Sequence, residues 1–322
     1  MLRKNWQNRE KLQAQATRQG FGEGLLAAAK LDPNIVALCA DLTGSLNMTD
    51  FQAAFPDRFF QVGVAEQNMA GVGAGLALSG KTVFISSFAA FNPGRNWEQI
   101  RVSIGYNNAN VKVIGSHAGL SVGEDGATHQ ALEDLATMRV IPNMSVISPA
   151  DGLEAKKATL AIARKKGPFY LRLCRAKTPL FTSPEAKFVI GQAQVLQPGR
   201  DLTLIATGPL VYEALAASLA LAKLGLKAGV INLHTVKPID QQAIVKAAKA
   251  TGAIVTIEDH QAYGGLGSAV AEVLVKHCPV PQEFVAVKDS FGESGQPAEL
   301  FHKYGLDAKH IFTAVKRVLK RK

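Results

Sequence analysis

A single carboxylate, Glu66, stands between an apolar strand predicted over residues 59–64 and a glycine-rich apolar helix predicted over 69–78. Water reaches such a junction poorly, so the carboxylate is well placed to take or share a proton. A structural role is the alternative, because an acid in the first turn of a helix stabilises the helix dipole. These residues alone leave both interpretations open.

Most of the other reactive polar groups fall in one run, residues 115–130, with the sequence Gly-Ser-His-Ala-Gly-Leu-Ser-Val-Gly-Glu-Asp-Gly-Ala-Thr-His-Gln. The run follows a predicted strand and so lies at the carboxyl edge of a sheet, where open α/β folds bind ligands. A purely structural loop of this length and composition is uncommon. Its histidines, His117 and His129, lack the helical spacing of a metal pair, so we predict polar substrate recognition and no metal ligands in this chain. His129 can also move protons near neutral pH.

Two rings, Phe88 and Phe91, are one helical turn apart directly after a predicted strand. Such pairs usually pack in a core. A flat aromatic cofactor ring would need the same apolar slot, so ligand binding is the second interpretation.

The glycine-rich run 264–267, ahead of a predicted helix, imitates a dinucleotide-binding fingerprint. Glu258 and Asp259 precede it, and their charges would repel a pyrophosphate, while no acid follows at the required distance. We therefore expect these glycines to allow close helix packing rather than phosphate binding.

The composition indicates a protein with sizeable cores and no nucleic-acid or membrane partner. Hydrophobic residues make up 47% of the 322 residues and charged residues only 19%, which favours burial of surface against another subunit. The net charge of +10 is concentrated at the ends of the chain and is not interleaved with aromatics, as nucleic-acid binding would want. No apolar run is long enough to span a bilayer, and the start of the chain lacks a signal-peptide core, so we expect a cytoplasmic protein. Of the three cysteines, Cys39 and Cys174 lie in apolar strands and are expected to be buried thiols.

Short apolar strands alternate with helices, which predicts an α/β fold of two domains, each a mainly parallel sheet covered by helices. In the first half the predicted strands are 35–39, 59–64, 82–85, 111–114, 144–147 and 169–173, and the predicted helices are 22–31, 69–78, 95–105 and 151–164. In the second half the predicted strands are 202–206, 228–232, 254–257 and 283–287, and the predicted helices are 211–224, 241–251, 267–276 and 307–319. The stretch 175–199, rich in proline, glycine and charge, is the predicted linker, and the domains are placed at 1–182 and 195–322.

Taken together, these motifs resemble the transketolase family. The resemblance rests on four segments in this order: Ala40-Asp41-Leu42-Thr43-Gly44-Ser45, Val64-Ala65-Glu66-Gln67-Asn68, Phe88-x-x-Phe91, and His117 followed by Gly123-Glu124-Asp125-Gly126-Ala127-Thr128-His129-Gln130. The last segment is the specific part, whereas the glutamate and the rings are shared more widely among thiamine diphosphate enzymes. The resemblance covers essentially the whole chain and implies a pyrimidine-binding domain followed by a transketolase C-terminal domain.

The resemblance implies thiamine diphosphate as the cofactor. Glu66 matches the family glutamate that bonds a ring nitrogen of the aminopyrimidine, which favours the imino tautomer and so the reactive ylide. Phe88 and Phe91 match the aromatic pocket around the pyrimidine, and Asp41 is expected to contribute to cofactor binding. His129 matches a histidine close to the reacting carbons, and is the second expected catalytic residue.

The resemblance also implies sugar phosphate substrates. Arg18 and Arg175 match phosphate-clamping arginines, with Ser45 and His117 as neighbours, and forked guanidinium donors suit phosphate oxygens. Asp125 matches the acid that reads the configuration of the sugar hydroxyls. The implied reaction transfers a two-carbon ketol unit from a ketose phosphate to an aldose phosphate, as in the pentose phosphate pathway.

The chain departs from the family pattern in three ways. A third ring common in the aromatic pocket is replaced by Ile85 or Gly94 at the positions one turn away, and Ala127 stands where proline is common. The Gly-Asp-Gly motif with its following asparagine, which holds the diphosphate and its magnesium, does not occur. The resemblance therefore implies the C-terminal half of a split transketolase. A separate N-terminal-half subunit would carry the motif and the magnesium, and the two would form a heterotetramer with the active site between chains.

Two alternatives were weighed against this interpretation. A beta subunit of an oxo-acid dehydrogenase complex, or a shortened deoxyxylulose phosphate synthase, would share the fold and the glutamate but not the full Gly-Glu-Asp-Gly-x-Thr-His-Gln context between phosphate-type arginines. A non-catalytic module of the same fold would have no physical need for the acid, the rings, the histidines and the arginines together. Which ketose and aldose phosphates react is left open by the sequence.

Overall fold

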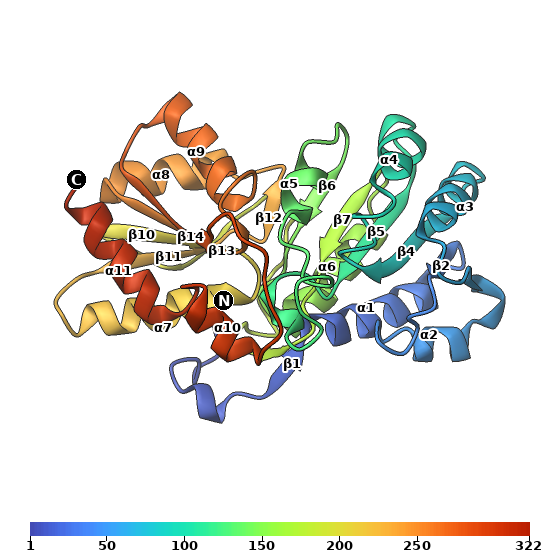
Figure 1. The fold of residues 1–322 in the computed structure, drawn as a ribbon, viewed down its shortest axis with the longest axis horizontal. Helices are drawn as coiled ribbons and strands as arrows, with labels where there is room; N and C mark the ends of the chain where they lie inside the picture. Colours follow the sequence, from blue (N-terminus) through green and yellow to red (C-terminus); the bar gives the residue numbers. More distant parts are fainter.

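The computed structural model describes all 322 residues and contains two α/β domains side by side (Figure 1). Each domain has its own sheet, of seven and of five strands, with helices on both faces. The predicted fold class is therefore confirmed. None of the helices combines the length and the apolar character that crossing a bilayer requires.

The first sheet is parallel except for one edge strand. Its order is β12 (Thr235–Lys237), β6 (Ser145–Ile147), β7 (Phe169–Arg172), β5 (Val111–Ser116), β4 (Thr82–Phe88), β2 (Ile35–Cys39) and β3 (Phe59–Gln61). The central strands are buried on both faces, as expected for continuous runs of apolar residues. Cys39 in β2 and Cys174 after β7 are free buried thiols, as predicted.

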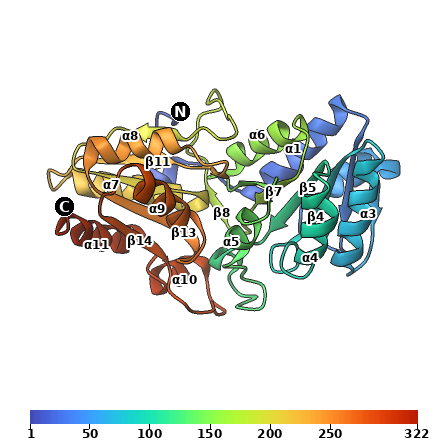
Figure 2. The ribbon, with the colours of Figure 1, turned by 90° about the horizontal axis from the view of Figure 1, so that it is seen from above.

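Helices cover the two faces of this sheet in two groups, which Figure 2 shows from above. On one face α1 (Thr17–Leu31) packs against α6 (Gly152–Ala163), with the short α2 (Thr49–Ala54) beside them. On the other face lie α3 (Glu66–Leu78), α4 (Trp97–Gln99) with the π-helix η3 (Ile100–Tyr106), and α5 (Asp134–Arg139). Each group forms its own apolar core with one side of the sheet.

The second sheet has the order β14 (Gln282–Val287), β13 (Ile254–Gln261), β10 (Leu202–Ala206), β11 (Ala228–Asn232) and β9 (Gln194–Gln197). All its strands are parallel except β9. One face is covered by α7 (Val211–Ala222) and α11 (Ala308–Leu319), with α10 (Pro297–Lys303) beyond them. The other face is covered by α8 (Gln241–Thr251) and α9 (Leu266–His277).

The two domains exchange segments in both directions. Strand β12 leaves the second half of the chain and pairs antiparallel with β6, so it closes the edge of the first sheet. In return, residues 1–12 lie on the second domain, where Leu2, Trp6 and Leu12 pack against its core. A small ribbon of β1 (Ala14–Ala16) and β8 (Lys177–Pro179) ties the start of the first domain to its end.

Most predicted elements occur in the structure, and the differences have local causes. The predicted strand 59–64 ends at Gln61, because the turn at Gly63, with φ +72°, breaks the extended backbone, and the following helix begins at Glu66. The predicted helix 95–105 consists of α4 and the wider π-turns of η3. Sequence periodicity did not predict α2, α5 or α10, which have only six, six and seven residues.

Candidate active site

Several predicted site residues meet at the carboxyl edge of the first sheet. Phe88 ends β4, and His117 directly follows the neighbouring strand β5. Asp41 follows β2, and Glu66 opens the helix after β3. Parallel strands bring their carboxyl ends to the same edge, so residues far apart in sequence converge there.

The aromatic rings and the two histidines form one cluster. Phe88 stacks on His117 with ring centroids 3.7 Å apart, and lies 6.2 Å from Phe91 in a nearly parallel orientation. The ring of His129 meets Phe91 edge-on at 5.4 Å. The rings thus combine an apolar wall with two imidazoles that can bond a polar ligand.

Glu66 is buried beside this cluster and its side chain does not cap the helix. The carboxylate is 1% exposed, and its Oε2 atom accepts a hydrogen bond from Nη1 of Arg95 at 2.8 Å. The N-cap residue of α3 is Ala65, which has no capping side chain. Asn96 donates to the backbone carbonyl of Glu66 at 3.0 Å and holds the start of the helix in place. The first-turn acid is therefore fixed at the sheet edge by an ion pair, with Oε1 left without a partner within the chain.

Arg95 is a site residue that the sequence argument missed. Besides pairing with Glu66, its guanidinium lies over the ring of Phe91, 4.6 Å from the centroid. It stands four residues after Phe91, so the two side chains can meet across one helical turn. That spacing is the signal that could have found it.

His117 is held as a neutral imidazole. The side chain is buried, and burial together with the charges of Arg18, Arg175 and His129 lowers its pKa to about 3. Its Nδ1 atom lies 3.0 Å from the hydroxyl of Ser116. His117 has a φ of +54°, an uncommon backbone conformation for a residue other than glycine. Near neutral pH it can therefore donate or accept a hydrogen bond but carries no charge.

The two arginines predicted to bind phosphate are near enough to His117 that both lower its pKa. The pKa of Arg18 is itself lowered, mainly by burial and further by the charge of Arg175. Nη1 of Arg18 donates to the backbone carbonyl of Ser45, while its buried Nε has no partner. Arg175 donates to the carbonyl of Val122 and pairs with the exposed carboxylate of Glu124. Two like charges held close together with an unused donor are suited to a bound anion.

The remaining predicted residues have looser positions. His129 is half-buried, with Nδ1 2.8 Å from the hydroxyl of Thr128. Asp41 is exposed with a φ of +60°, and its backbone N–H donates to the side chain of Gln61 at 2.6 Å. Asp125 is exposed on the loop, and no contact within the chain joins it or Asp41 to the ring cluster.

The glycine-rich run before α9 packs closely, as predicted. A side chain at Gly267 would lie 2.3 Å from the ring of Phe284. The buried carboxylate of Glu258 already accepts the backbone N–H groups of Leu266 and Gly267, at 2.7 and 2.8 Å. This helix start is therefore filled by a side chain of the protein and offers no phosphate site.

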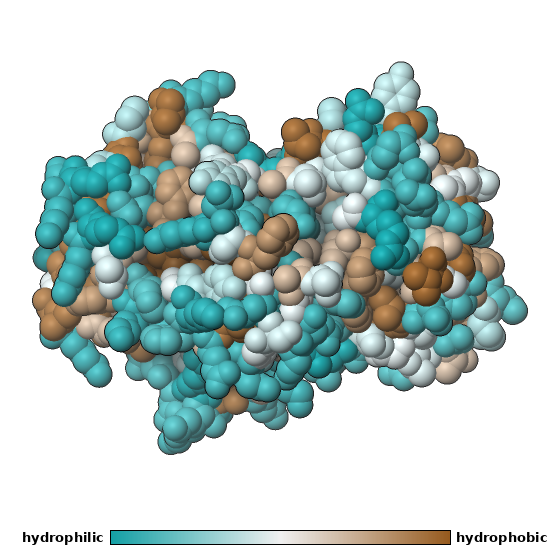
Figure 3. All heavy atoms as spheres, in the orientation of Figure 1, coloured by the Kyte–Doolittle hydropathy of each residue, from teal (hydrophilic) through white to brown (hydrophobic).

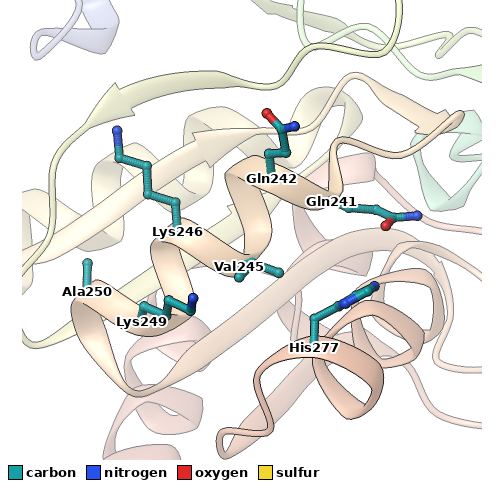
Figure 4. Close-up of a pocket in the computed structure, with 7 residues that line it drawn as sticks. All are labelled: Gln241, Gln242, Val245, Lys246, Lys249, Ala250 and His277. Atoms are coloured by element: carbon teal, nitrogen blue, oxygen red, sulfur yellow. The ribbon is translucent and has the colours of Figure 1, made fainter.

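Two hollows lie elsewhere, on the second domain around α8. One of about 760 Å³ is lined by exposed Lys246 and Lys249 of α8 and by His277 of α9 (Figure 4). The other, of about 550 Å³, lies between α8 and the sheet edge at β9. Neither includes a predicted site residue, so we place the candidate site by its chemistry rather than by the size of a hollow.

The site residues fit one end of the expected cofactor. A wall of rings beside a single buried carboxylate suits a flat, basic aminopyrimidine, and the arginine pair suits a substrate anion. One His/Asp/Glu triad in the chain has its ligand atoms within 4.8 Å of one another, namely His302, Asp307 and His310. This triad joins α10 to α11, and none of the predicted site residues belongs to it.

Comparisons with known proteins identify both domains. Residues 13–179 match the family model for the transketolase pyrimidine-binding domain, and residues 191–311 match the model for the transketolase C-terminal domain. A putative transketolase C-terminal section from Methanocaldococcus jannaschii is 46% identical over 94% of this chain and 96% of its own length. A 6-deoxy-6-sulfo-D-fructose transketolase subunit from a Clostridium species is 43% identical over 97% of both chains.

Among solved structures, a protein described as a split gene transketolase, an inactive beta4 tetramer, superposes with a TM-score of 0.90. It is 46% identical, and the alignment covers 95% of this chain and 99% of that one. These matches are to transketolases and not to oxo-acid dehydrogenase subunits.

Proposed function

Because the chain belongs to the transketolase family, we propose that it is the C-terminal-half subunit of a split, thiamine diphosphate-dependent transketolase. The observation that carries the proposal is the grouping of Glu66, the ring cluster and the arginine pair at one sheet edge. The reaction is transfer of a two-carbon ketol unit between sugar phosphates. When bound, the cofactor supplies a carbon nucleophile that carries this unit.

Glu66 supplies the carboxylate that bonds the cofactor's aminopyrimidine. Its burial and its single partner, Arg95, leave Oε1 as a free acceptor beside the apolar wall of Phe88 and Phe91. Arg95 compensates the buried charge and keeps the carboxylate in one orientation. Oε1 of Glu66 can then share a hydrogen-bonded proton with a ring nitrogen of the ligand.

The histidines and arginines bind the sugar. His129 stands at the edge of the ring cluster, where it can donate to or accept from a hydroxyl of the substrate near the reacting carbons. The neutral His117 and the guanidinium groups of Arg18 and Arg175 bind the terminal anion. Ser45 and Asp125 complete the polar rim, with Ser45 held by Arg18 and Asp125 free to contact hydroxyls.

A partner subunit completes the site. We infer that a separate N-terminal-half protein with the Gly-Asp-Gly motif holds the diphosphate and its magnesium, because that motif does not occur in this chain. The outer face of α3 suits a subunit contact, since Val72 and Leu78 are exposed and no neighbouring atom lies within 4 Å of a side chain built on Gly71 or Gly75. Figure 3 shows apolar patches among polar ones on the half of the molecule that carries α3. Two mixed pairs would form a heterotetramer, and a site completed by a second chain would be shallow in the single chain.

Reconstitution tests the proposal. We expect the purified chain alone, with thiamine diphosphate and magnesium, to have no ketol-transfer activity, and the mixture with an N-terminal-half subunit to have it. The assay should use a panel of ketose donors that end in phosphate or sulfonate, because two guanidinium groups accommodate either anion. Light scattering with and without the partner would measure assembly. Robust turnover by the isolated chain, or a partner that never associates with it, would contradict the shared-site proposal.

A further inference from the structure

Two adjacent buried carboxylates at the end of β13 have different targets. Glu258 binds the start of α9 within its own domain. Asp259 crosses the domain boundary: its Oδ1 accepts the backbone N–H of Leu120 at 2.9 Å. Leu120 begins η4 (Leu120–Val122), a single turn in the loop that carries His117 and His129. Asp259 therefore caps a turn of the other domain from outside it.

The loop is shaped to receive this carboxylate. Gly119 has a φ of +76°, and a side chain built on it would lie 2.0 Å from Oδ2 of Asp259. Only glycine allows the backbone to approach so closely. On the other side, Nη2 of Arg172 donates to the backbone carbonyl of Asp259 at 2.8 Å and holds the end of the strand. The position of the carboxylate relative to η4 is thus determined from both sides.

The turn that Asp259 caps is in contact with the candidate anion site. The carbonyl of Val122, the last residue of η4, accepts a hydrogen bond from Arg175. His117 lies three residues before Leu120, and Ala118 between them is tied to Leu173 by a backbone hydrogen bond of 3.0 Å. A shift of η4 would therefore move the Val122 carbonyl that accepts from Arg175, and would move the backbone next to His117 with it.

Two further contacts from the second domain hold the same loop. Gln130 donates to the carbonyl of Glu293 at 2.9 Å, and Gln296 donates to the carboxylate of Glu124 at 3.1 Å. Neither hydrogen bond involves a residue of η4, and the carboxylate of Glu124 that accepts the second one is exposed. Asp259 supplies the fully buried hydrogen bond to the turn, and apolar packing of Leu120 in one core with Leu300 of α10 holds the turn as well.

We propose that Asp259 is a positioning residue for substrate binding: by capping η4 it fixes the placement of Arg175 and His117, and so the affinity for the terminal anion of the sugar. The proposal rests on the proposed function, because it assigns the second domain a task in that same site. The second domain then contributes no group that touches substrate, and acts through the loop.

The test compares Asp259→Ala with Glu258→Ala in the reconstituted complex. Both remove a buried carboxylate that accepts backbone N–H groups from a turn or helix start, so both are expected to lower thermal stability. We expect Asp259→Ala to raise KM for a phosphorylated acceptor at least tenfold, with kcat within threefold of wild type. Glu258→Ala should leave KM within twofold. Asp259→Asn, which keeps the Oδ1 acceptor, should restore KM to within threefold of wild type.

Hydrogen exchange in the full chain gives a readout that needs no turnover. The amide of Leu120 should exchange at least tenfold faster in Asp259→Ala and unchanged in Glu258→Ala. If Asp259→Ala does not fold, Asp259→Ser replaces it, since serine is too short to reach Leu120.

The outcomes separate the two proposals. An active wild-type complex in which Asp259→Ala leaves KM unchanged, or in which Glu258→Ala raises it equally, overturns the positioning role. A wild-type complex that assembles but transfers no ketol unit overturns the proposed function instead. In that case, binding of inorganic phosphate by calorimetry decides the positioning role, which stands only if Asp259→Ala weakens it at least fivefold.

Discussion

The first and second domains share an architecture of parallel strands between two layers of helices, yet the carboxyl edges of their sheets differ. At the edge of the first sheet, Glu66 has one free carboxylate oxygen and Arg18 has a buried N–H without a partner. At the edge of the second, the carboxylate of Glu258 is bonded through both oxygens to the start of α9. Asp259 beside it bonds the neighbouring domain.

This difference shows how the same fold is used for binding in one place and for support in another. Buried polar groups are normally paired, and an unpaired one costs free energy. Both edges retain such groups, because Nε of Arg18 at the first edge and Oδ2 of Asp259 and Nε2 of His234 at the second lack partners. At the first edge, however, the unused donor belongs to one of two arginines beside a neutral histidine, whereas at the second the acids Glu258 and Asp259 accept backbone N–H groups. Anion binding is therefore expected at the first edge, and the following predictions test that contrast.

The largest expected effect is at Glu66. In the reconstituted complex, Glu66→Gln should slow deuterium exchange of the acidic C–H of bound thiamine diphosphate by about 10²–10⁴-fold, the usual range for loss of a general acid–base group. Assembly should be unaffected, because the amide keeps an acceptor for Arg95. Glu98→Gln, at an exposed acid in the same region, is the matched control. In that variant the C–H of the bound cofactor should exchange at the wild-type rate. Near wild-type exchange in Glu66→Gln would make Glu66 a structural residue, and the two edges would then be alike.

The arginine pair should give the next largest effect. Arg18→Ala and Arg175→Ala should each weaken phosphorylated substrates by roughly 1.5–3 kcal/mol, which is about 10- to 150-fold in kcat/KM. Non-phosphorylated sugars should be nearly unaffected. Arg58→Ala removes another half-buried arginine of the same domain, one that bonds only backbone carbonyls, and should not discriminate between the two substrate types. Equal losses on both types in the site variants would instead indicate a folding defect.

Acid stability should depend on one buried histidine in each domain, His117 and His234. Burial lowers the pKa of His117 to about 3 and that of His234 to about 4. At pH values between these folded-state pKa values and the unfolded-state pKa of about 6.5, the unfolded chain binds more protons than the folded chain. The stability that depends on the neutral histidines is therefore fully present above pH 6.5 and is lost as the pH falls. The loss should be roughly 2 kcal/mol per histidine at pH 5. Urea unfolding at pH 8 and pH 5 of His117→Asn, His234→Asn and the exposed control His277→Asn would measure it.

Phosphate sharpens this comparison. An anion bound to Arg18 and Arg175 cancels part of the charge that lowers the pKa of His117, and so should reduce its acid sensitivity. The pKa of His234 is lowered by burial, with no contribution from neighbouring charges. Phosphate should therefore leave its acid sensitivity unchanged. An equal response of the two histidines would remove the arginine pair as the anion site.

The smallest effect should come from Glu258. Glu258→Gln keeps one acceptor for the start of α9 and should cost about 1 kcal/mol of folding free energy, the scale of a lost cap. Chemical denaturation measures the loss, and KM for every substrate should stay unchanged. A selective loss of substrate binding in this variant would mean that the second edge also takes part in the site.

The sequence predicted best those features of fold and site that depend on residues contiguous in the chain. Alternation of apolar strands and helices predicted both sheets, and the run 115–130 predicted a polar loop at a sheet edge. Contacts between distant segments were not predictable in this way. Arg95 contacts Glu66, which lies 29 residues earlier in the sequence. Asp259 contacts Leu120, which lies 139 residues earlier and in the other domain. Strand β12 has only three residues, too few to show a periodicity of its own.

The exchange of segments between the domains has a consequence for how such a chain can be divided. Strand β12 covers the edge of β6, and Lys237 donates to the carbonyls of Arg139 and Ile141 at 2.9 and 2.6 Å. A break in the stretch between the two matched domains would leave β6 as an open, apolar edge, which invites aggregation. It would also separate residues 1–12 from the core on which they lie. Gene fission at that boundary would yield two fragments that each expose apolar surface and tend to aggregate. We therefore expect the two domains to be encoded together in one gene.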